Sequence, residues 1–328
     1  MKHISILIPE GDCSLVNVQG SHQILSEVNS VLARAGKPPM FKIQLVGIKK
    51  ENPMINGLFT IRPDVLIGEV EHTDLIIIPA VFGDKQKVIE NNKPFMPWLI
   101  QQHKQGAGIA TYCIGAFLLA STGLLNGKKV ATHWVEAENF RQMFPDVELM
   151  PDKIITDEHG IYTSGGAYSW LNLVLYLIEK FAGRDMAIVC SKLFEIQIER
   201  NSQSAFMIFN PQKLHEDDVI KQVQEYIEKN YEERISVDDL AMKFGLSRRN
   251  LERRFRKVTY NSIVEYLQRV RIEAAKQTLE RNRENVNEAM YKAGYNDIKA
   301  FRTTFKKLTG LSPLEYRNKY SRVSAAVA

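Results

Sequence analysis

The N-terminal part of the chain alternates between two hydrophobic patterns. Short, nearly continuous apolar runs are separated by longer segments in which apolar residues recur with a helical period. The apolar runs, which predict strands, are ISILIP (4–9), FKIQLVGI (41–48), DLIIIPA (74–80) and GAGIATYC (106–113). Segments 21–36 and 95–106 predict helices. Apolar strands that alternate with helices indicate an α/β fold with a mostly parallel sheet and helices on both faces.

The pattern changes around residues 198–213, where the sequence IERNSQSAFMIFNPQK is polar and contains a proline. Beyond this segment only helical periods follow. A chain of 328 residues is long enough for two domains that each bury a core. We therefore expect an α/β domain at 1–198, a linker at 199–213 and an all-α domain at 214–328.

Charge differs between the two parts. Residues 1–210 carry 19 basic and 21 acidic side chains, a net charge of −2. Residues 211–328 carry 24 basic and 17 acidic side chains, a net charge of +7. A basic segment beside a nearly neutral one is typical of a nucleic-acid-binding module attached to another domain. A solvated charged surface would have the same charge, so the residue pattern must decide between them.

Composition argues against several classes of protein. No apolar run reaches the roughly eighteen residues of a membrane span, and MKHISILIPEG at the N-terminus indicates a first strand and not a secretion signal. Cys13, Cys113 and Cys190 are far apart and form no CxxC pair. This usage suits a reducing cytoplasm and argues against a zinc site. We expect a cytoplasmic protein without a metal or cofactor.

Cys113 stands at a position that suits chemistry. It ends the run at 106–113, and IGAFLLAST (114–122) continues as an apolar helix. Strand, turn and helix in this order have the geometry of a nucleophile elbow. Ligands of parallel sheets bind at the carboxyl ends of the strands, where Cys113 would lie. A helix N-terminus there would lower the thiol pKa and favour the thiolate.

Segment 110–134, ATYCIGAFLLASTGLLNGKKVATHW, resembles the cysteine elbow of the PfpI-like (class I glutamine amidotransferase-like) superfamily, and the likeness extends over residues 3–185. It is most similar to the form found in GlxA-type regulators. The resemblance implies a flavodoxin-like sheet and a pair formed by Cys113 and His133. In the superfamily's enzymes a carboxylate after the first strand completes the site, but Asn17 stands at that position here. The glycine pair after the central strand is also missing, and only Gly83 remains.

These departures argue against catalysis. Neutral Asn17 can hydrogen-bond a ligand but cannot act as a general base, and the loss of the glycine pair weakens an oxyanion hole. We therefore expect no enzyme, and instead an effector pocket that reuses the elbow site. Its candidate residues are Cys113, His133, Asn17, Gly83 and Ile114. An inert buried thiol, a redox-sensing thiol and a dimerisation domain without a ligand remain alternatives.

The C-terminal part carries a basic two-helix pattern. In 235–259, ISVDDLAMKFGLSRRNLERRFRKVT, Ser236 and Ser247 are predicted helix caps, and Gly245 supplies a turn with positive φ. Leu251 and Phe255 face inward, whereas the other faces of the second helix are mostly Arg and Lys. A short helix, a glycine turn and an Arg-rich helix are typical of a helix-turn-helix unit, whose second helix enters the major groove.

The same pattern occurs twice. FRKVT (255–259) matches FKKLT (305–309) at an offset of fifty residues, and Gly245 matches Gly294 at forty-nine. Asp297 is the predicted cap of the second basic helix. Between the two units, 262–282 predicts one long helix. A duplicated basic unit favours nucleic-acid binding over a merely solvated surface.

Residues 214–320 resemble the AraC/XylS DNA-binding domain, and AGYNDIKAFRTTFKKLTGLSPLEYR (293–317) follows the signature of its second half with Tyr295 in place of Phe. The resemblance implies two units that read two successive major grooves. The residues that it places against bases are Arg249, Glu252, Arg253, Ile298, Lys299 and Thr303. The expected phosphate contacts are Arg248, Lys257, Arg302 and Lys306, and Asn250 is a further candidate on the first basic helix.

The two resemblances together imply a GlxA-type transcriptional regulator. Its first domain would sense a small-molecule effector or dimerise, and its second would bind double-stranded promoter DNA. A homodimer follows only from the habit of the superfamily. The alternative is a cysteine-dependent amidase or isonitrile-hydratase-like enzyme with an accessory DNA-binding domain.

The isolated segment 211–328 is expected to bind duplex DNA with strong salt dependence. Its net charge of +7 and several phosphate contacts would release counterions, each contact adding about −0.9 to the slope of log K against log salt. Fluorescence anisotropy of a labelled duplex at increasing salt measures this slope. A flat slope, or no binding at low salt, would contradict the DNA-binding interpretation.

Overall fold

The structure, a computed structural model, describes residues 1–198, 202–281 and 284–321. It divides into two compact units, Met1–Gln203 and Ser204–Ala328, which are described separately below. The first residues of the predicted linker, 199–201, lie outside the described part of the chain.

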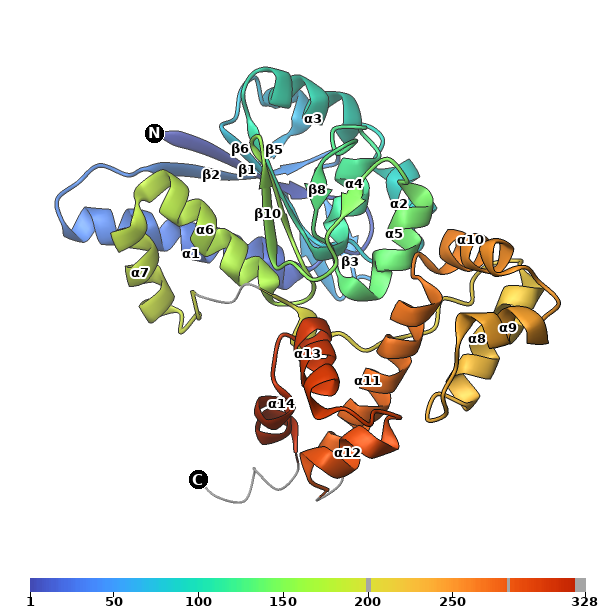
Figure 1. The fold of residues 1–328 in the computed structure, drawn as a ribbon. Coiled ribbons are helices and arrows are strands. Elements are labelled where there is room, and N and C mark those ends of the chain that lie inside the picture. Colours follow the sequence, from blue (N-terminus) through green and yellow to red (C-terminus); the bar gives the residue numbers. More distant parts are fainter. Residues whose placement is uncertain (199–201, 282–283, 322–328) are drawn as a thin grey trace. The chain divides into compact units, whose positions relative to one another are not determined.

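A mostly parallel sheet forms the centre of the first unit (Figure 1). Within the described residues its seven strands run in the order β10 (Ile155–Glu158), β11 (Ile161–Ser164), β7 (Gly108–Tyr112), β6 (Leu75–Ile78), β1 (Lys2–Ile8), β2 (Phe41–Gly47) and β5 (Val65–Leu66). Every neighbouring pair is parallel except β10 with β11. The predicted α/β fold is confirmed.

Helices cover both faces of this sheet. Figure 1 shows α1 (Leu15–Arg34), α6 (Ser169–Ala182) and α7 (Arg184–Leu193) together on one side. The other helices of the unit are α2 (Lys85–Asn91), α3 (Phe95–Lys104), α4 (Ala116–Ala120) and α5 (Ala137–Met143). The 3₁₀ turns are η1 (Ile67–Glu69), η2 (Cys113–Gly115) and η3 (Trp134–Glu136). Two small sheets pair β3 (Asn52–Met54) with β4 (Phe59–Ile61) and β8 (Lys129–Val130) with β9 (Glu148–Leu149).

Burial on both faces explains the continuous apolar strands. All four residues of β6 are buried, and so are the last four of β7. On the face that α1 and α6 cover, the two helices approach closely at Gly20, where an added Cβ would lie 2.3 Å from the indole of Trp170. A larger residue at Gly20 would therefore force the helices apart.

The second unit is all helical. It begins with η4 (Ser204–Phe206) and continues with α8 (Asp218–Lys229), α9 (Val237–Lys243), α10 (Arg248–Thr259), α11 (Ile263–Arg281), α12 (Val286–Lys292), α13 (Ile298–Thr309) and α14 (Pro313–Tyr320). The predicted caps are confirmed: Ser236, Ser247 and Asp297 each accept hydrogen bonds from backbone N–H groups of the helix that follows.

The long helix α11 belongs to two hydrophobic cores. Ile263 and Tyr266, near its start, pack with α8, α9 and α10. Ile272 and Leu279, further along, pack with α12, α13 and α14. The turn before α13 then brings the halves together, because a Cβ at Gly294 (φ +76°) would lie 2.8 Å from backbone carbonyls of the first half.

Candidate functional site

The elbow at Cys113 has the predicted order of strand, turn and helix. Cys113 follows β7 directly, begins η2 and adopts φ +54°, a left-handed conformation that costs an L-residue roughly 1–2 kcal/mol. The backbone is tightly packed there, because a Cβ at Gly115 would lie 2.4 Å from the carbonyl oxygen of Pro79. Ile114, between them, is buried. The elbow therefore fixes the sulfur at the carboxyl edge of the sheet.

The expected low pKa of Cys113 is wrong. Burial raises the pKa of the thiol above its ordinary value, and the nearby carboxylate of Glu136 adds to this effect. Hydrogen bonds from the backbone N–H groups of Ala167 and Ile114 and the charge of Lys85 oppose it without reversing it. The helix that follows, α4, has only five residues, so its dipole is a weak counterweight to desolvation. Cys113 is a neutral thiol at neutral pH.

His133 lies beside the elbow, but its ring nitrogen Nδ1 is hydrogen-bonded within its own loop. Its Nδ1 accepts a hydrogen bond from the backbone N–H of Val135 at 3.2 Å, so a neutral ring carries its proton on Nε2. Its ring fills the space next to Gly166, where a Cβ would lie 2.7 Å away. Burial lowers the pKa of His133, against the opposing charge of Glu136. Neutral imidazole and neutral thiol form no ion pair, and no hydrogen bond joins Cys113 to His133 among the residues described.

Asn17 has a structural partner. The residue lies in α1, is 4% exposed, and its Oδ1 accepts a hydrogen bond from the backbone N–H of Ala80 at 3.1 Å. The N–H of Ser14 donates to the carbonyl of the same Ala80. Asn17 thus holds the chain that leaves β6. Gly83, shortly after, adopts φ +101°, a conformation that requires glycine.

The structure adds two charged residues that the sequence analysis missed. Glu136 pairs with Lys85 at 3.4 Å, and both charges act on the pKa of Cys113. The Lys85 side chain is only 10% exposed, and its Nζ lies 5.7 Å from the centroid of the Phe117 ring. Glu136 follows His133 by three residues on one turn, a spacing that could have pointed to it. Lys85 reaches the site only through the fold.

The two basic helices of the second unit have matching exposure. On α10 the residues Leu251, Phe255 and Thr259 are buried, and on α13 Phe301, Phe305 and Thr309 are buried at the equivalent positions. Most predicted DNA contacts are exposed: Arg248, Arg249, Glu252, Arg253, Lys257, Lys299, Arg302, Thr303 and Lys306. Asn250 and Ile298 are half-buried. Their roles toward DNA stay predictions.

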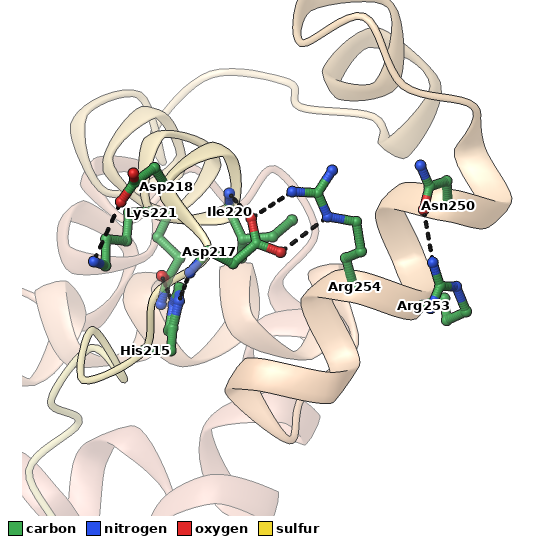
Figure 2. A network of polar contacts seen from close by, with 9 residues as sticks. His215, Asp217, Asp218, Ile220, Lys221, Asn250, Arg253 and Arg254 are labelled. Atoms are coloured by element: carbon green, nitrogen blue, oxygen red, sulfur yellow. Dashed lines mark hydrogen bonds and ion pairs between the residues drawn. The ribbon is translucent and has the colours of Figure 1, made fainter.

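Several of these side chains already have partners within the protein. Arg248 bonds Asp238 at 3.0 Å and Glu252 at 3.2 Å, so its expected phosphate contact requires it to turn away from these carboxylates. The Arg253 guanidinium donates to Asn250 Oδ1 at 3.1 Å on the face of α10 that points away from α8 (Figure 2). On α13, Lys307 joins the predicted residues Arg302, Thr303 and Lys306 in lining a shallow, open hollow of the surface.

Arg254, next to Arg253 on α10, forms an ion pair within the unit. Its Nε and Nη2 donate to the two carboxylate oxygens of Asp217 at 2.9 and 2.6 Å (Figure 2). Asp217 also caps α8, because Oδ1 accepts from the N–H of Ile220. This fork ties α10 to the start of α8 and holds the pKa of Asp217 below its ordinary value.

Comparisons with known proteins agree with this architecture. Residues 25–180 match the model of the DJ-1/PfpI family, and residues 240–319 match the model of a helix-turn-helix domain. The chain carries a DJ-1/PfpI domain followed by a helix-turn-helix domain. Both resemblances that the sequence carries are thereby confirmed.

Two relatives match this chain over most of its length. The HTH-type transcriptional regulator GbdR of Pseudomonas aeruginosa is 26% identical over 258 residues, 78% of this chain and 69% of that protein. The HTH-type transcriptional regulator GlxA of Rhizobium meliloti is 26% identical over 222 residues, 65% of this chain and 66% of that protein. A solved AraC family transcriptional regulator from Pseudomonas putida superposes with a TM-score of 0.50 at 14% identity, over 59% of this chain and 100% of that one, a likeness of fold alone.

In the part of the chain that the structure describes, no group of three or more His, Cys, Asp or Glu side chains is arranged to hold a metal ion. No helix among the described residues combines the length and apolarity needed to cross a membrane.

Alkylation of Cys113 by iodoacetamide is expected to accelerate with pH up to and beyond 9.0, the ordinary thiol value, because burial raises its pKa. Mass spectrometry of the peptide that contains Cys113 measures the rate in the full chain. The variant His133→Ala should alkylate as slowly as wild type at pH 7, because neutral His133 stabilises no thiolate. A midpoint well below 9.0 that disappears in His133→Ala would instead indicate a catalytic thiolate–imidazolium pair.

Arg254→Ala is expected to lower the melting temperature of the full chain, because Asp217 loses its bidentate partner. The decrease in melting temperature should have its full size above about pH 3.9, the ordinary pKa of Asp. It should shrink as the pH falls below that value, because the folded-state pKa of Asp217 is lowered. Calorimetry at several pH values measures this. Arg253→Ala on the same helix is the matched control and should melt near wild type; equal losses would contradict a structural role specific to Arg254.

Proposed function

We propose that this protein is a sequence-specific DNA-binding transcriptional regulator. The observation that carries the proposal is the duplication of one exposed cationic surface, on α10 and on α13, over two cores that share α11. Two such helices joined by one rigid helix suit two successive major grooves of a duplex. The relatives GbdR and GlxA, named as HTH-type transcriptional regulators, support the same function.

The DJ-1/PfpI domain acts in this proposal as the sensor. Its elbow site presents a neutral thiol, a neutral imidazole and the Lys85–Glu136 pair at the carboxyl edge of a parallel sheet. Small ligands of such sheets bind at this edge. A ligand shifts the equilibrium between two conformations only if it binds one of them better. An effector bound beside Cys113 would therefore have to favour one arrangement of the loops that carry the site.

An enzyme is the second candidate, because Glu136 supplies a carboxylate near both Cys113 and His133. A cysteine-dependent amidase or hydratase needs a thiolate or a base that produces one. The raised pKa of Cys113, and the hydrogen bond that His133 Nδ1 accepts from its own loop, weigh against this candidate. The proposed regulator is a homodimer in the cytoplasm.

Selection of random duplexes with the full chain tests the proposed function. Enriched sites should hold two short half-sites about 10–10.5 base pairs apart, since both helices approach one face of the DNA. Arg253→Ala should cost about 1–3 kcal/mol on the enriched site and relax preference at one base pair, whereas Lys306→Ala should weaken all sequences alike. Quantitative binding to the enriched site and to random DNA separates the two effects.

Two outcomes would count against this assignment. If no sequence were enriched, the protein would not be a sequence-specific regulator. If Arg253→Ala and Lys306→Ala reduced affinity equally on enriched and random DNA, the division into base-reading and phosphate-binding residues would be wrong.

A further inference from the structure

Gln203 is a buried amide at the last position of the first unit. It is 2% exposed, and its side chain uses both of its polar atoms. Its Nε2 lies 3.0, 2.8 and 3.2 Å from the carbonyl oxygens of Thr132, Pro151 and Lys153, and its two hydrogens are shared among these three acceptors. Its Oε1 accepts from the N–H of Gly166 at 2.9 Å. The residue is therefore anchored among several loops of the DJ-1/PfpI domain, although it belongs to neither a strand nor a helix.

One of these loops lies between Gln203 and His133. A Cβ at Gly165 would lie 2.8 Å from the Gln203 amide, and a Cβ at Gly166 would lie 2.7 Å from the His133 ring. Both positions therefore need glycine for space. The backbone N–H of the next residue, Ala167 (φ +47°), acts on the sulfur of Cys113 and opposes the rise of its pKa. This loop therefore packs between Gln203 and His133, and its backbone at Ala167 acts on the Cys113 thiol.

A second loop makes the same connection. The carbonyl of Thr132 accepts from Gln203, while its Oγ1 donates to the carbonyl of Cys113 at 2.8 Å. The residue after Thr132 is His133. The two loops that carry the site are therefore both hydrogen-bonded to Gln203.

The segment that follows Gln203 is fixed to the second half of the DNA-binding unit. The carbonyl of Ala205 accepts from Tyr320 Oη at 3.3 Å. The carbonyl of Met207 accepts from Lys276 Nζ at 2.7 Å, and Lys276 is 4% exposed. Tyr320 and Lys276 belong to α14 and α11, which pack around the second core.

Further residues of the segment contact the middle of α11 and the first half. The N–H of Phe209 donates to Glu273 at 3.1 Å, and its ring packs edge-on against Tyr266 at 5.2 Å. The carbonyl of Gln212 accepts from the buried Gln224 at 2.9 Å. Residues 204–212 therefore brace both helix-turn-helix halves, and they begin at the residue directly after Gln203.

We propose that Gln203 positions the elbow site and couples it to the DNA-binding unit. A small ligand that displaces the loop 165–167 or His133 must change the hydrogen bonds of Gln203, because the amide is buried within the same loops and closed to bulk solvent. The covalent chain carries that change into the brace at 204–212. The inference rests on the proposed function, since it names the residue through which the sensor site acts.

Linkage makes the coupling measurable without knowing the effector. If the site and the DNA-binding unit are coupled, DNA binding must alter the site just as a ligand there alters DNA binding. The probe is the duplex recovered by selection with the full chain. The readout is hydrogen–deuterium exchange of two peptides, with and without saturating duplex. One peptide contains Gly166 and Ala167, and the other contains Thr132 and His133.

In wild type, DNA is expected to change exchange at these peptides by about fivefold or more, the lower end of typical coupling between sites. In Gln203→Ala this DNA-dependent change should disappear. The matched control is Gln102→Ala: Gln102 is 1% exposed and bonds Thr73, Val70 and Glu71 within the same unit. Gln102→Ala should lower stability but keep the DNA-dependent change. If Gln203 had only a structural role, Gln203→Ala would behave in the same way.

A second variant covers the case in which Gln203→Ala fails to fold. Gly165→Ala keeps Gln203 but places a methyl group against its amide, and it should also reduce the DNA-dependent change. Two results would overturn the coupling: exchange at the two peptides that ignores DNA in wild type, or a DNA-dependent change of wild-type size in both Gln203→Ala and Gly165→Ala. Absence of any enriched duplex would instead refute the proposed function.

Discussion

Parallel pairing of β6 with β7 is the constraint on which the elbow site depends. Ile78 pairs with Thr111, so both strands end at the same edge of the sheet. Two residues further on, the backbones of Ala80 and Cys113 leave that edge, one held by Asn17 and the other by the left-handed turn at the elbow. The site is therefore a product of strand register, and its residues approach one another from distant parts of the sequence.

The same constraint decides the chemistry of the thiol. Strands that are buried on both faces place the elbow in a low-dielectric environment, which disfavours the charged form of a thiol. A catalytic cysteine overcomes this cost with a nearby imidazolium or a long helix dipole. Here Nδ1 of His133 is hydrogen-bonded to its own loop and α4 is short, so desolvation keeps the pKa of the thiol raised. The elbow retains the geometry of a nucleophile without its activation.

The sequence predicted the features that depend on local physics. Continuous apolar runs predicted the buried parallel strands, and Ser236, Ser247 and Asp297 predicted helix starts because capping is a short-range interaction. The duplication predicted two helix-turn-helix units. By contrast, Arg254 pairs with a residue thirty-seven positions away, and nothing in its local pattern separates it from Arg253.

The elbow site was less predictable for the same reason. Cys113 and His133 were found through a motif, but the pKa of the thiol depends on how deeply the fold buries it. Lys85 and Glu136 meet across fifty-one positions, and Gln203 contacts Thr132 across seventy-one. Hydrophobic periodicity carries no information about polar contacts of such range. Only the three-dimensional packing identifies them.

The chemistry of Gln203 explains why this position needs an amide. Its surroundings offer one N–H group, from Gly166, and three carbonyl oxygens, including that of Thr132. A glutamate of the same shape would accept from Gly166 but repel the carbonyls, and an apolar side chain would leave all four groups without a partner. An amide satisfies donors and acceptors together, and it does so only in one orientation. A shift of either loop therefore reaches Gln203 as a lost hydrogen bond, which makes the residue sensitive to small displacements at the site.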